Sequence, residues 1–131
     1  MELAINTGLT VCAKPFVKWA GGKGQLLSTF EQYYPSELIQ GCIKRYIEPF
    51  VGGGAVLFDI LQKYRIEEAF IYDINEDLIN TYQVIKNDVD ALVEFLSDLE
   101  DRYLKLNKDA RTDMYYEVRD FYNSRPLKAI Q

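Results

Sequence analysis

The feature that most constrains this chain is a run of three glycines between an apolar segment and an amphipathic one. Residues 46–51 predict a short strand, Gly52-Gly53-Gly54 follows directly, and apolar residues then recur at helical spacing over residues 55–61. Consecutive glycines cost backbone entropy, so they suit positions that need a positive φ or that bring a ligand close to the backbone. The pattern predicts a strand–turn–helix unit.

A second strand is predicted after this helix. Residues 69–72 are apolar and indicate a buried strand, and Asp73 stands at its C-terminal end, nineteen residues after Gly54. In nucleotide-binding α/β folds, an acid about 20 residues beyond such a loop binds the ribose hydroxyls. Aspartate is also a preferred helix cap, so Asp73 as a simple N-cap of the next helix is the alternative.

The glycine run does not match a dinucleotide fingerprint. That fingerprint needs a third glycine for close packing of helix and strand, and Leu57 occupies its position. A dinucleotide-binding oxidoreductase is therefore the less favoured class. Glu48, Pro49 and Phe50 place a carboxylate and an aromatic face before the turn, which suits a cationic ligand such as S-adenosylmethionine.

A second glycine turn lies upstream. Gly21-Gly22-Lys23 precedes apolar residues at helical spacing, so backbone N–H groups at that helix start are available to a carboxylate. Taken singly, Trp19 and Lys23 would more often be a core indole and a solvated lysine.

Three segments together resemble the cofactor motifs of the Dam-type (D12 class) adenine-specific DNA methyltransferases, in that family's order. They are Pro-Phe-Val-Lys-Trp-Ala-Gly-Gly-Lys at 15–23, Glu-Pro-Phe-Val-Gly-Gly-Gly at 48–54, and Tyr-Asp-Ile-Asn-Glu-Asp-Leu-Ile-Asn at 72–80. The resemblance covers residues 14–90 closely, and residues 115–123 resemble a helix found later in the family.

The resemblance implies a partial Rossmann-like class I methyltransferase fold, α/β with parallel strands and a helical C-terminal extension. Residues 14–90 would be the S-adenosylmethionine-binding part, and residues 91–131 a helical segment leading to the target-recognition region of one truncated domain. S-adenosylmethionine is the implied cofactor and double-stranded DNA the implied partner.

The resemblance also assigns residues to the cofactor. Trp19 and Lys23 would contact the methionine end, Asp73 the ribose, and Ile74 would lie beside the adenine. Lys18 is similar to a lysine that faces DNA in relatives. The full cofactor-binding set comprises Trp19, Ala20, Gly21, Gly22, Lys23, Glu48, Pro49, Phe50, Gly52, Gly53, Gly54, Asp73 and Ile74.

The family's catalytic segment is not in this sequence. Adenine-N6 methylation in the family depends on an Asp-Pro-Pro-Tyr segment that holds the flipped base, whereas the four prolines here are never adjacent. We therefore expect no catalytic residue in this chain and no methyl transfer by the chain alone. A non-catalytic remnant that binds S-adenosylmethionine or DNA is the alternative.

The charge of the chain is unevenly distributed. The net charge is −5, but residues 102–131 carry seven basic and four acidic side chains, and the acids concentrate in residues 59–101. DNA could meet the two ends of the chain, although solvated helix faces explain the same counts.

Other functional classes find little support. Two isolated cysteines and no histidine provide no zinc set, and we expect the cysteines to be reduced and partly buried. The sequence shows neither a transmembrane segment nor a signal peptide, which implies a cytoplasmic protein.

The C-terminal third predicts two helices. Apolar residues at spacings of three and four over 89–106 predict one amphipathic helix, and a second is expected to start near Arg111 and to be closed by Pro126. Two strands alone form a marginal sheet, so we expect self-association. It would occur either by pairing of sheet edges or by exchange of the C-terminal helices between chains, which would bury the tyrosine and leucine faces of residues 89–122.

Overall fold

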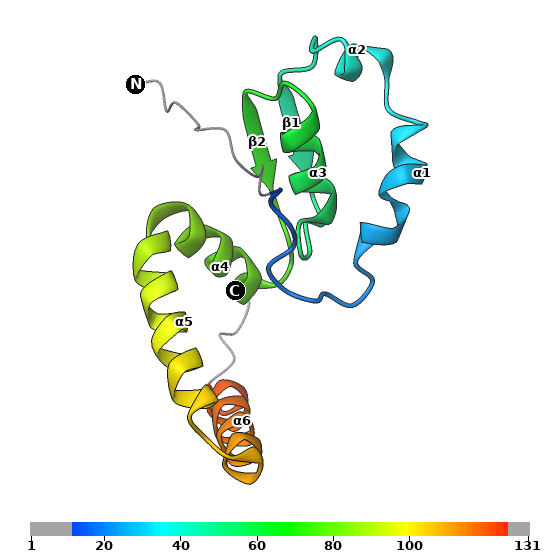
Figure 1. Cartoon of the computed structure of the whole chain (residues 1–131). Coiled ribbons are helices and arrows are strands. Elements are labelled where there is room, and N and C mark those ends of the chain that lie inside the picture. The colour runs from blue at the N-terminus through cyan, green and yellow to red at the C-terminus, as the bar shows by residue number, and fades with distance from the viewer. Residues whose placement is uncertain (1–11, 126–131) are drawn as a thin grey trace. The chain divides into compact units, whose positions relative to one another are not determined.

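A computed structural model describes residues 12–125 and divides the chain into two compact units, one ending at Thr81 and the other beginning at Tyr82. The first unit contains the 3-10 helix η1 (Lys23–Leu26), α1 (Leu27–Glu31), α2 (Ser36–Ile39), β1 (Arg45–Glu48), α3 (Ala55–Lys63), β2 (Glu68–Ile71) and the start of α4 (Glu76–Asn87) (Figure 1). The second contains the remainder of α4, α5 (Val89–Leu104) and α6 (Lys108–Asn123). Pro126 and most of a possible strand at residues 9–12 lie outside the described residues.

β1 and β2 pair in parallel, with α3 as the connection between them. Ile47 is the register partner of Phe70, and Glu48 that of Ile71. This confirms the predicted α/β arrangement of strand, glycine turn, helix and parallel strand. β1 ends at Glu48, earlier than predicted, because Pro49 has no N–H to extend the ladder.

The strand predicted at residues 69–72 is confirmed as β2, but the prediction that it is buried is wrong. Phe70 and Tyr72 are 44% and 55% exposed, and Ile47, beside Phe70 in the register, is 62% exposed. Side chains alternate between the two faces of a sheet, so these residues share one face, which the described residues leave open. The buried apolar residues of this unit are Leu38, Val51, Leu57, Ile60 and Leu78.

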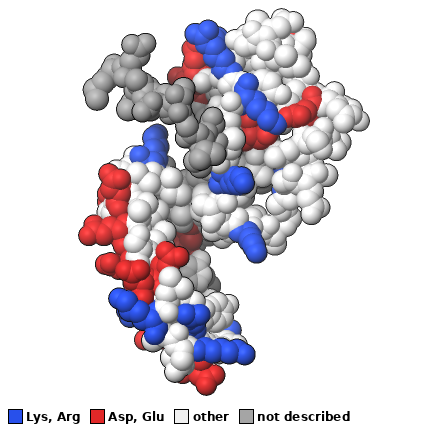
Figure 2. All heavy atoms as spheres, in the orientation of Figure 1, with Lys and Arg blue, Asp and Glu red and all other residues white. Residues whose placement is uncertain are grey.

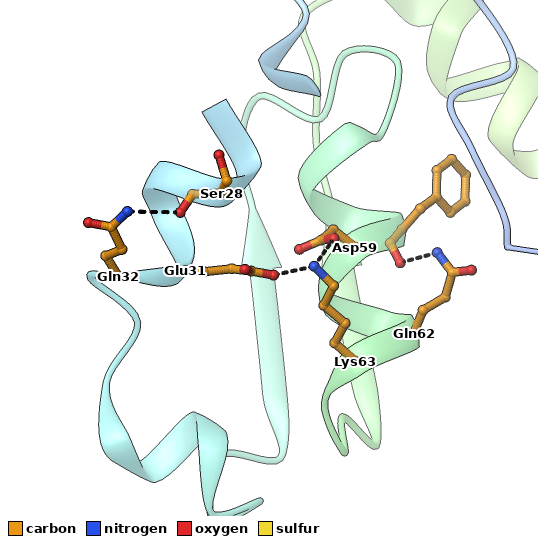
Figure 3. A network of polar contacts seen from close by, with 7 residues as sticks. Ser28, Glu31, Gln32, Asp59, Gln62 and Lys63 are labelled. Carbon is orange, nitrogen blue, oxygen red and sulfur yellow. Dashed lines mark hydrogen bonds and ion pairs between the residues drawn. The ribbon is translucent and has the colours of Figure 1, made fainter. Parts of the chain in front are cut away.

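Two neighbouring side chains of α3 tether the N-terminal segment on both sides of residues 15–25. Lys63 forms ion pairs with Glu31 at the end of α1 and with Asp59 one turn earlier in α3 (Figure 3). Gln62 exchanges two hydrogen bonds with the backbone of Ala13: Ala13 N–H donates to Oε1 at 2.6 Å, and Nε2 donates to the Ala13 carbonyl at 3.0 Å. The segment between these anchors is thereby held against α3.

In the second unit, α6 begins earlier than the sequence predicted. Asn107 caps it by accepting a hydrogen bond from Ala110 N–H at 3.0 Å, which satisfies a donor of the first turn. Arg111 instead binds the C-terminal end of α5, where its guanidinium donates to the carbonyls of Tyr103 and Leu104 at 3.1 and 2.8 Å. The predicted amphipathic helix over 89–106 is confirmed as α5.

Both cysteines are free, and both are exposed rather than partly buried as predicted. Cys42 follows α2 in a connecting segment, where its backbone N–H donates to the Glu37 carbonyl at 2.8 Å. Connections of this kind run over the protein surface, which accounts for the exposure of its side chain.

Candidate functional site

One cleft in the first unit collects three separate stretches of the chain. It encloses about 920 Å³ and is lined by parts of residues 15–25, by residues around the glycine turn, and by Asp73. Clefts of roughly 300–1,000 Å³ are typical of small-molecule and cofactor sites. The glycine turn joins β1 to α3, and Asp73 follows β2. The carboxyl ends of both parallel strands therefore contribute to the cleft.

The glycine turn packs directly against residues 15–19. A Cβ on Gly53 would lie 3.1 Å from the Val17 carbonyl oxygen, and one on Gly52 would lie 3.1 Å from Cδ1 of Trp19. Gly54 has φ of +81° and forms the N-cap of α3, a left-handed conformation that favours glycine. Each of the three glycines is thus required by a close approach, by backbone conformation, or by both.

Glu48 is the one charged side chain that is buried among residues 12–125. The Tyr46 hydroxyl donates to its Oε2 at 2.7 Å, and Lys23 Nζ lies 3.5 Å from its Oε1. Lys23 also donates to the Phe50 carbonyl at 3.1 Å. Burial, followed by the hydrogen bond to Glu48, raises the pKa of Tyr46 well above its ordinary value, so this hydroxyl remains a donor.

Asp73 ties the glycine turn to the start of α4. Its Oδ2 accepts a hydrogen bond from Gly52 N–H, and its Oδ1 accepts one from Asn75 N–H, both at 3.0 Å. Asn75 is the residue that caps α4, since its Oδ1 accepts from Leu78 N–H at 2.9 Å. Asp73 is therefore not a simple N-cap, and its carboxylate lines the cleft.

Comparison of the sequence with known proteins places this chain in a family. The model of the D12 class N6 adenine-specific DNA methyltransferases matches residues 19–131, most of the chain. This chain belongs to that class. The resemblance of the three sequence motifs is thereby confirmed.

Individual relatives agree with this family assignment. The chain is 59% identical over 110 residues to the Type II methyltransferase M.MjaIII of Methanocaldococcus jannaschii, covering 84% of this chain and 38% of that protein. It is 36% identical over 112 residues to a DNA adenine methylase of Haemophilus influenzae, covering 85% of this chain and 34% of the relative. The chain therefore spans between a third and two-fifths of the length of these relatives. No solved structure matches it.

The cleft brings together most of the residues that the sequence analysis assigned to cofactor binding. Those that line it are Trp19, Ala20, Gly21, Gly22, Lys23, Glu48, Phe50, Gly52, Gly53 and Asp73, together with Lys18. Three others do not line it. Pro49 lies in the turn after β1, Gly54 is buried as the cap of α3, and Ile74 is 84% exposed.

Several residues that line the cleft were missed. They are Pro15, Phe16, Val17, Gly24, Gln25, Val51, Ala55 and Val56. Four of them, Pro15, Phe16, Val17 and Val51, lie within the motifs at 15–23 and 48–54, and the others lie within two residues of these motifs, so proximity to a motif was the available signal. Their side chains are apolar, absent or neutral, so residue chemistry alone did not single them out. Within the part of the chain that the structure describes, no helix is both long and apolar enough to cross a membrane.

Proposed function

We propose that this chain is the S-adenosylmethionine-binding part of a DNA adenine-N6 methyltransferase, built on a partial Rossmann-like sheet. Residues 14–90 would hold the cofactor, and residues 91–131 would lead to the target-recognition region. The observation that carries the proposal is the single cleft that joins the glycine turn, the Lys23–Glu48 ion pair and Asp73. Its volume and its donors and acceptors fit a nucleoside joined to a zwitterionic amino acid.

The ribose would bind Asp73. Each oxygen of its carboxylate accepts one backbone hydrogen bond. An ionised carboxylate has about four acceptor sites, which leaves capacity for two ribose hydroxyls. The two existing bonds fix the orientation of the carboxylate, so the hydroxyls would meet an acceptor that is already positioned.

The methionine end would bind at Lys23 and Glu48. A Lys–Glu pair presents one positive and one negative group, which complements the carboxylate and ammonium of an α-amino acid. Trp19 and Phe50 also line the cleft and offer aromatic faces to the sulfonium. Gly52 and Gly53 would let the ligand approach the backbone, because no Cβ stands in its way.

The remaining predicted residues would act less directly. Pro49 ends the strand, and Gly54 begins α3, so both shape the turn that carries the contacts. Ala20, Gly21 and Gly22 form the upstream turn before η1, where Gly22 N–H donates to the Trp19 carbonyl at 3.0 Å. The exposed side chain of Ile74 would contact the adenine ring of the bound ligand.

Bound S-adenosylmethionine would supply an electrophilic methyl group on its sulfonium. In the whole enzyme, the acceptor would be N6 of an adenine taken out of the duplex. The residues of this chain would bind and orient, whereas the Asp-Pro-Pro-Tyr segment that holds the base does not occur in its sequence. We therefore propose that the chain alone transfers no methyl group.

DNA contact would come from basic residues at two places. Lys18 is exposed in the first unit. In the second unit, acidic side chains run along α5, and basic ones gather toward the α5–α6 connection (Figure 2). Arg102 near the end of α5, Lys105 after it and Lys108 at the start of α6 are exposed basic residues. Binding through such phosphate contacts would be weak and would fall steeply with salt.

Isothermal calorimetry tests the cofactor proposal. We expect S-adenosylmethionine and S-adenosylhomocysteine to bind the chain and NAD not to bind, because Leu57 is buried where a dinucleotide fold needs glycine. NAD binding without S-adenosylmethionine binding would overturn the proposal.

A methyl-transfer assay tests the second part of the proposal. Pure chain, labelled S-adenosylmethionine and duplex DNA should give no transfer above a control lacking protein, while a filter-binding assay at low salt detects weak DNA retention. Turnover of labelled methyl onto adenine would contradict the expectation of inactivity and leave cofactor binding intact.

A further inference from the structure

Tyr46 is placed to control the buried carboxylate of the cleft without lining the cleft itself. It lies two residues before Glu48 in β1, so both side chains emerge on the same face of the strand. Its hydroxyl is 2.7 Å from Oε2 of Glu48, whereas Glu48 but not Tyr46 belongs to the cleft wall. Tyr46 therefore does not line the cleft itself but contacts a residue that does.

The two oxygens of Glu48 have different partners. Oε2 accepts from Tyr46, and Oε1 faces Lys23 at 3.5 Å. The side chain of Lys23 is 40% exposed and that of Glu48 only 7%, so Oε1 is the oxygen beside the solvent-accessible partner. A buried carboxylate needs hydrogen-bond donors, and a donor on one oxygen fixes the direction of the other.

We propose that Tyr46 is a positioning residue that presents Oε1 of Glu48 to the ammonium group of the ligand's amino-acid end. This inference rests on the proposed function, because it takes S-adenosylmethionine as the ligand. The hydroxyl donates to Oε2 and so leaves Oε1 for a second partner. Without it, the carboxylate would be free to rotate and would pair less well with the ammonium group.

A purely structural role for Tyr46 makes a different prediction. If the hydroxyl only stabilised the strand, its loss would weaken every ligand of the cleft to a similar extent. If it positions Glu48, its loss would weaken only ligands that carry the amino acid. The two roles are therefore separated by comparing a ligand with that group and one without it.

The experiment measures binding of S-adenosylmethionine and of 5′-methylthioadenosine, which keeps the adenosine and sulfur but lacks the amino-acid end. Tyr46→Phe should weaken S-adenosylmethionine roughly tenfold, about the contribution of one hydrogen bond to a charged group. It should change methylthioadenosine affinity by less than about twofold. Tyr33→Phe removes the hydroxyl of a tyrosine that is 80% exposed and is the matched control for both ligands.

A double-mutant cycle with Glu48→Gln provides the second arm. In the Gln background, Tyr46→Phe should have no further effect on S-adenosylmethionine, because the charge that it positions is gone. Equal weakening of both ligands, no weakening of either, or an undiminished effect in the Gln background would overturn the inference. Failure of the unmodified chain to bind either ligand would instead reject the proposed function.

Discussion

The residues around the cleft and the two long C-terminal helices differ in how much of their surface is buried. Around the cleft, Glu48 is buried, Asp73 is bonded to two backbone N–H groups, and Leu57 and Ile60 of α3 are in the core. α5 and α6 have sixteen residues each, and none of them is buried. Amphipathic spacing is therefore sufficient to form a helix, but specific close contacts are what define a site.

Asp73→Ala is expected to give the largest effect, a loss of ligand affinity, and it tests the cleft. Removing a carboxylate that accepts hydrogen bonds should weaken S-adenosylhomocysteine by about 1.5–3 kcal/mol, roughly 10- to 150-fold. Calorimetry measures it. Asp120→Ala is the control, because that carboxylate pairs with neighbouring Arg119 on α6 and is 68% exposed. An equal loss in both variants would show that the effect is not local to the cleft.

The difference between the regions also explains what could be predicted from sequence. Asp73 was identified because its distance from Gly54 and its place after a strand are fixed by the connectivity of a strand–helix–strand unit. Its hydrogen bond to Gly52 was not predicted, since that bond depends on the backbone path through the turn. Tyr46 was overlooked because a tyrosine in a strand usually signifies packing.

The sequence predicted whether a segment is a helix or a strand better than it predicted where the segment begins or how deeply it is buried. The start of α6 was placed near Arg111 because the apolar stripe begins there, but the capping side chain of Asn107 begins the helix earlier. Phe70 was predicted to be buried from its apolar neighbours, yet it is 44% exposed. Periodicity reports which face is apolar, whereas burial depends on what covers that face, and local sequence does not contain that information.

A pair of small-to-large substitutions compares the glycine turn with helix α5 through their effects on the free energy of unfolding. Gly53→Val should lower the free energy of unfolding by about 1–3 kcal/mol, because its side chain would meet the Val17 carbonyl and two side chains at 3.1–3.5 Å. Ala91→Val on an exposed position of α5 should cost no more than about 0.7 kcal/mol. Urea denaturation followed by circular dichroism measures both. Similar losses would mean that the glycine turn tolerates a side chain.

Alkaline pH should lower the stability of the first unit. The pKa of Tyr46 is raised above its ordinary 10.0, mainly by burial and then by its hydrogen bond to Glu48. The pKa of Lys63 is raised above 10.5 by hydrogen bonds to Asp59 and then Glu31. A group with a raised folded-state pKa contributes stability below its unfolded pKa and loses it as pH rises. Stability should therefore fall above about pH 10.

Tyr46→Phe separates the tyrosine contribution from that of Lys63. At about pH 11, Tyr46 would be ionised in the unfolded chain and still protonated in the folded one, which costs the wild type up to about 1.4 kcal/mol. The variant lacks this cost, so its stability deficit relative to wild type should narrow between about pH 8 and pH 11. Denaturation curves at both pH values measure the gap, and a constant gap would contradict the raised pKa.

The exposed faces of α5 and α6 lead us to predict self-association. Of the proposed substitutions, the one that tests it should change stability least. Phe95 and Leu96 on α5 are 65% and 50% exposed, and Phe121 on α6 is 74% exposed. Exposed apolar side chains favour association, so we propose that the chain forms dimers or larger species at micromolar concentration. Light scattering should therefore report a mass above that of one chain. Leu96→Glu should reduce that mass while changing monomer stability by no more than about 0.5 kcal/mol, since surface substitutions rarely exceed this value.

Ile39→Glu is the control, because its side chain is 64% exposed in α2 of the first unit. If the helices carry the association, this control should leave the mass unchanged. A monomeric wild type with a cooperative melt would show that the exposed faces of α5 and α6 do not drive association.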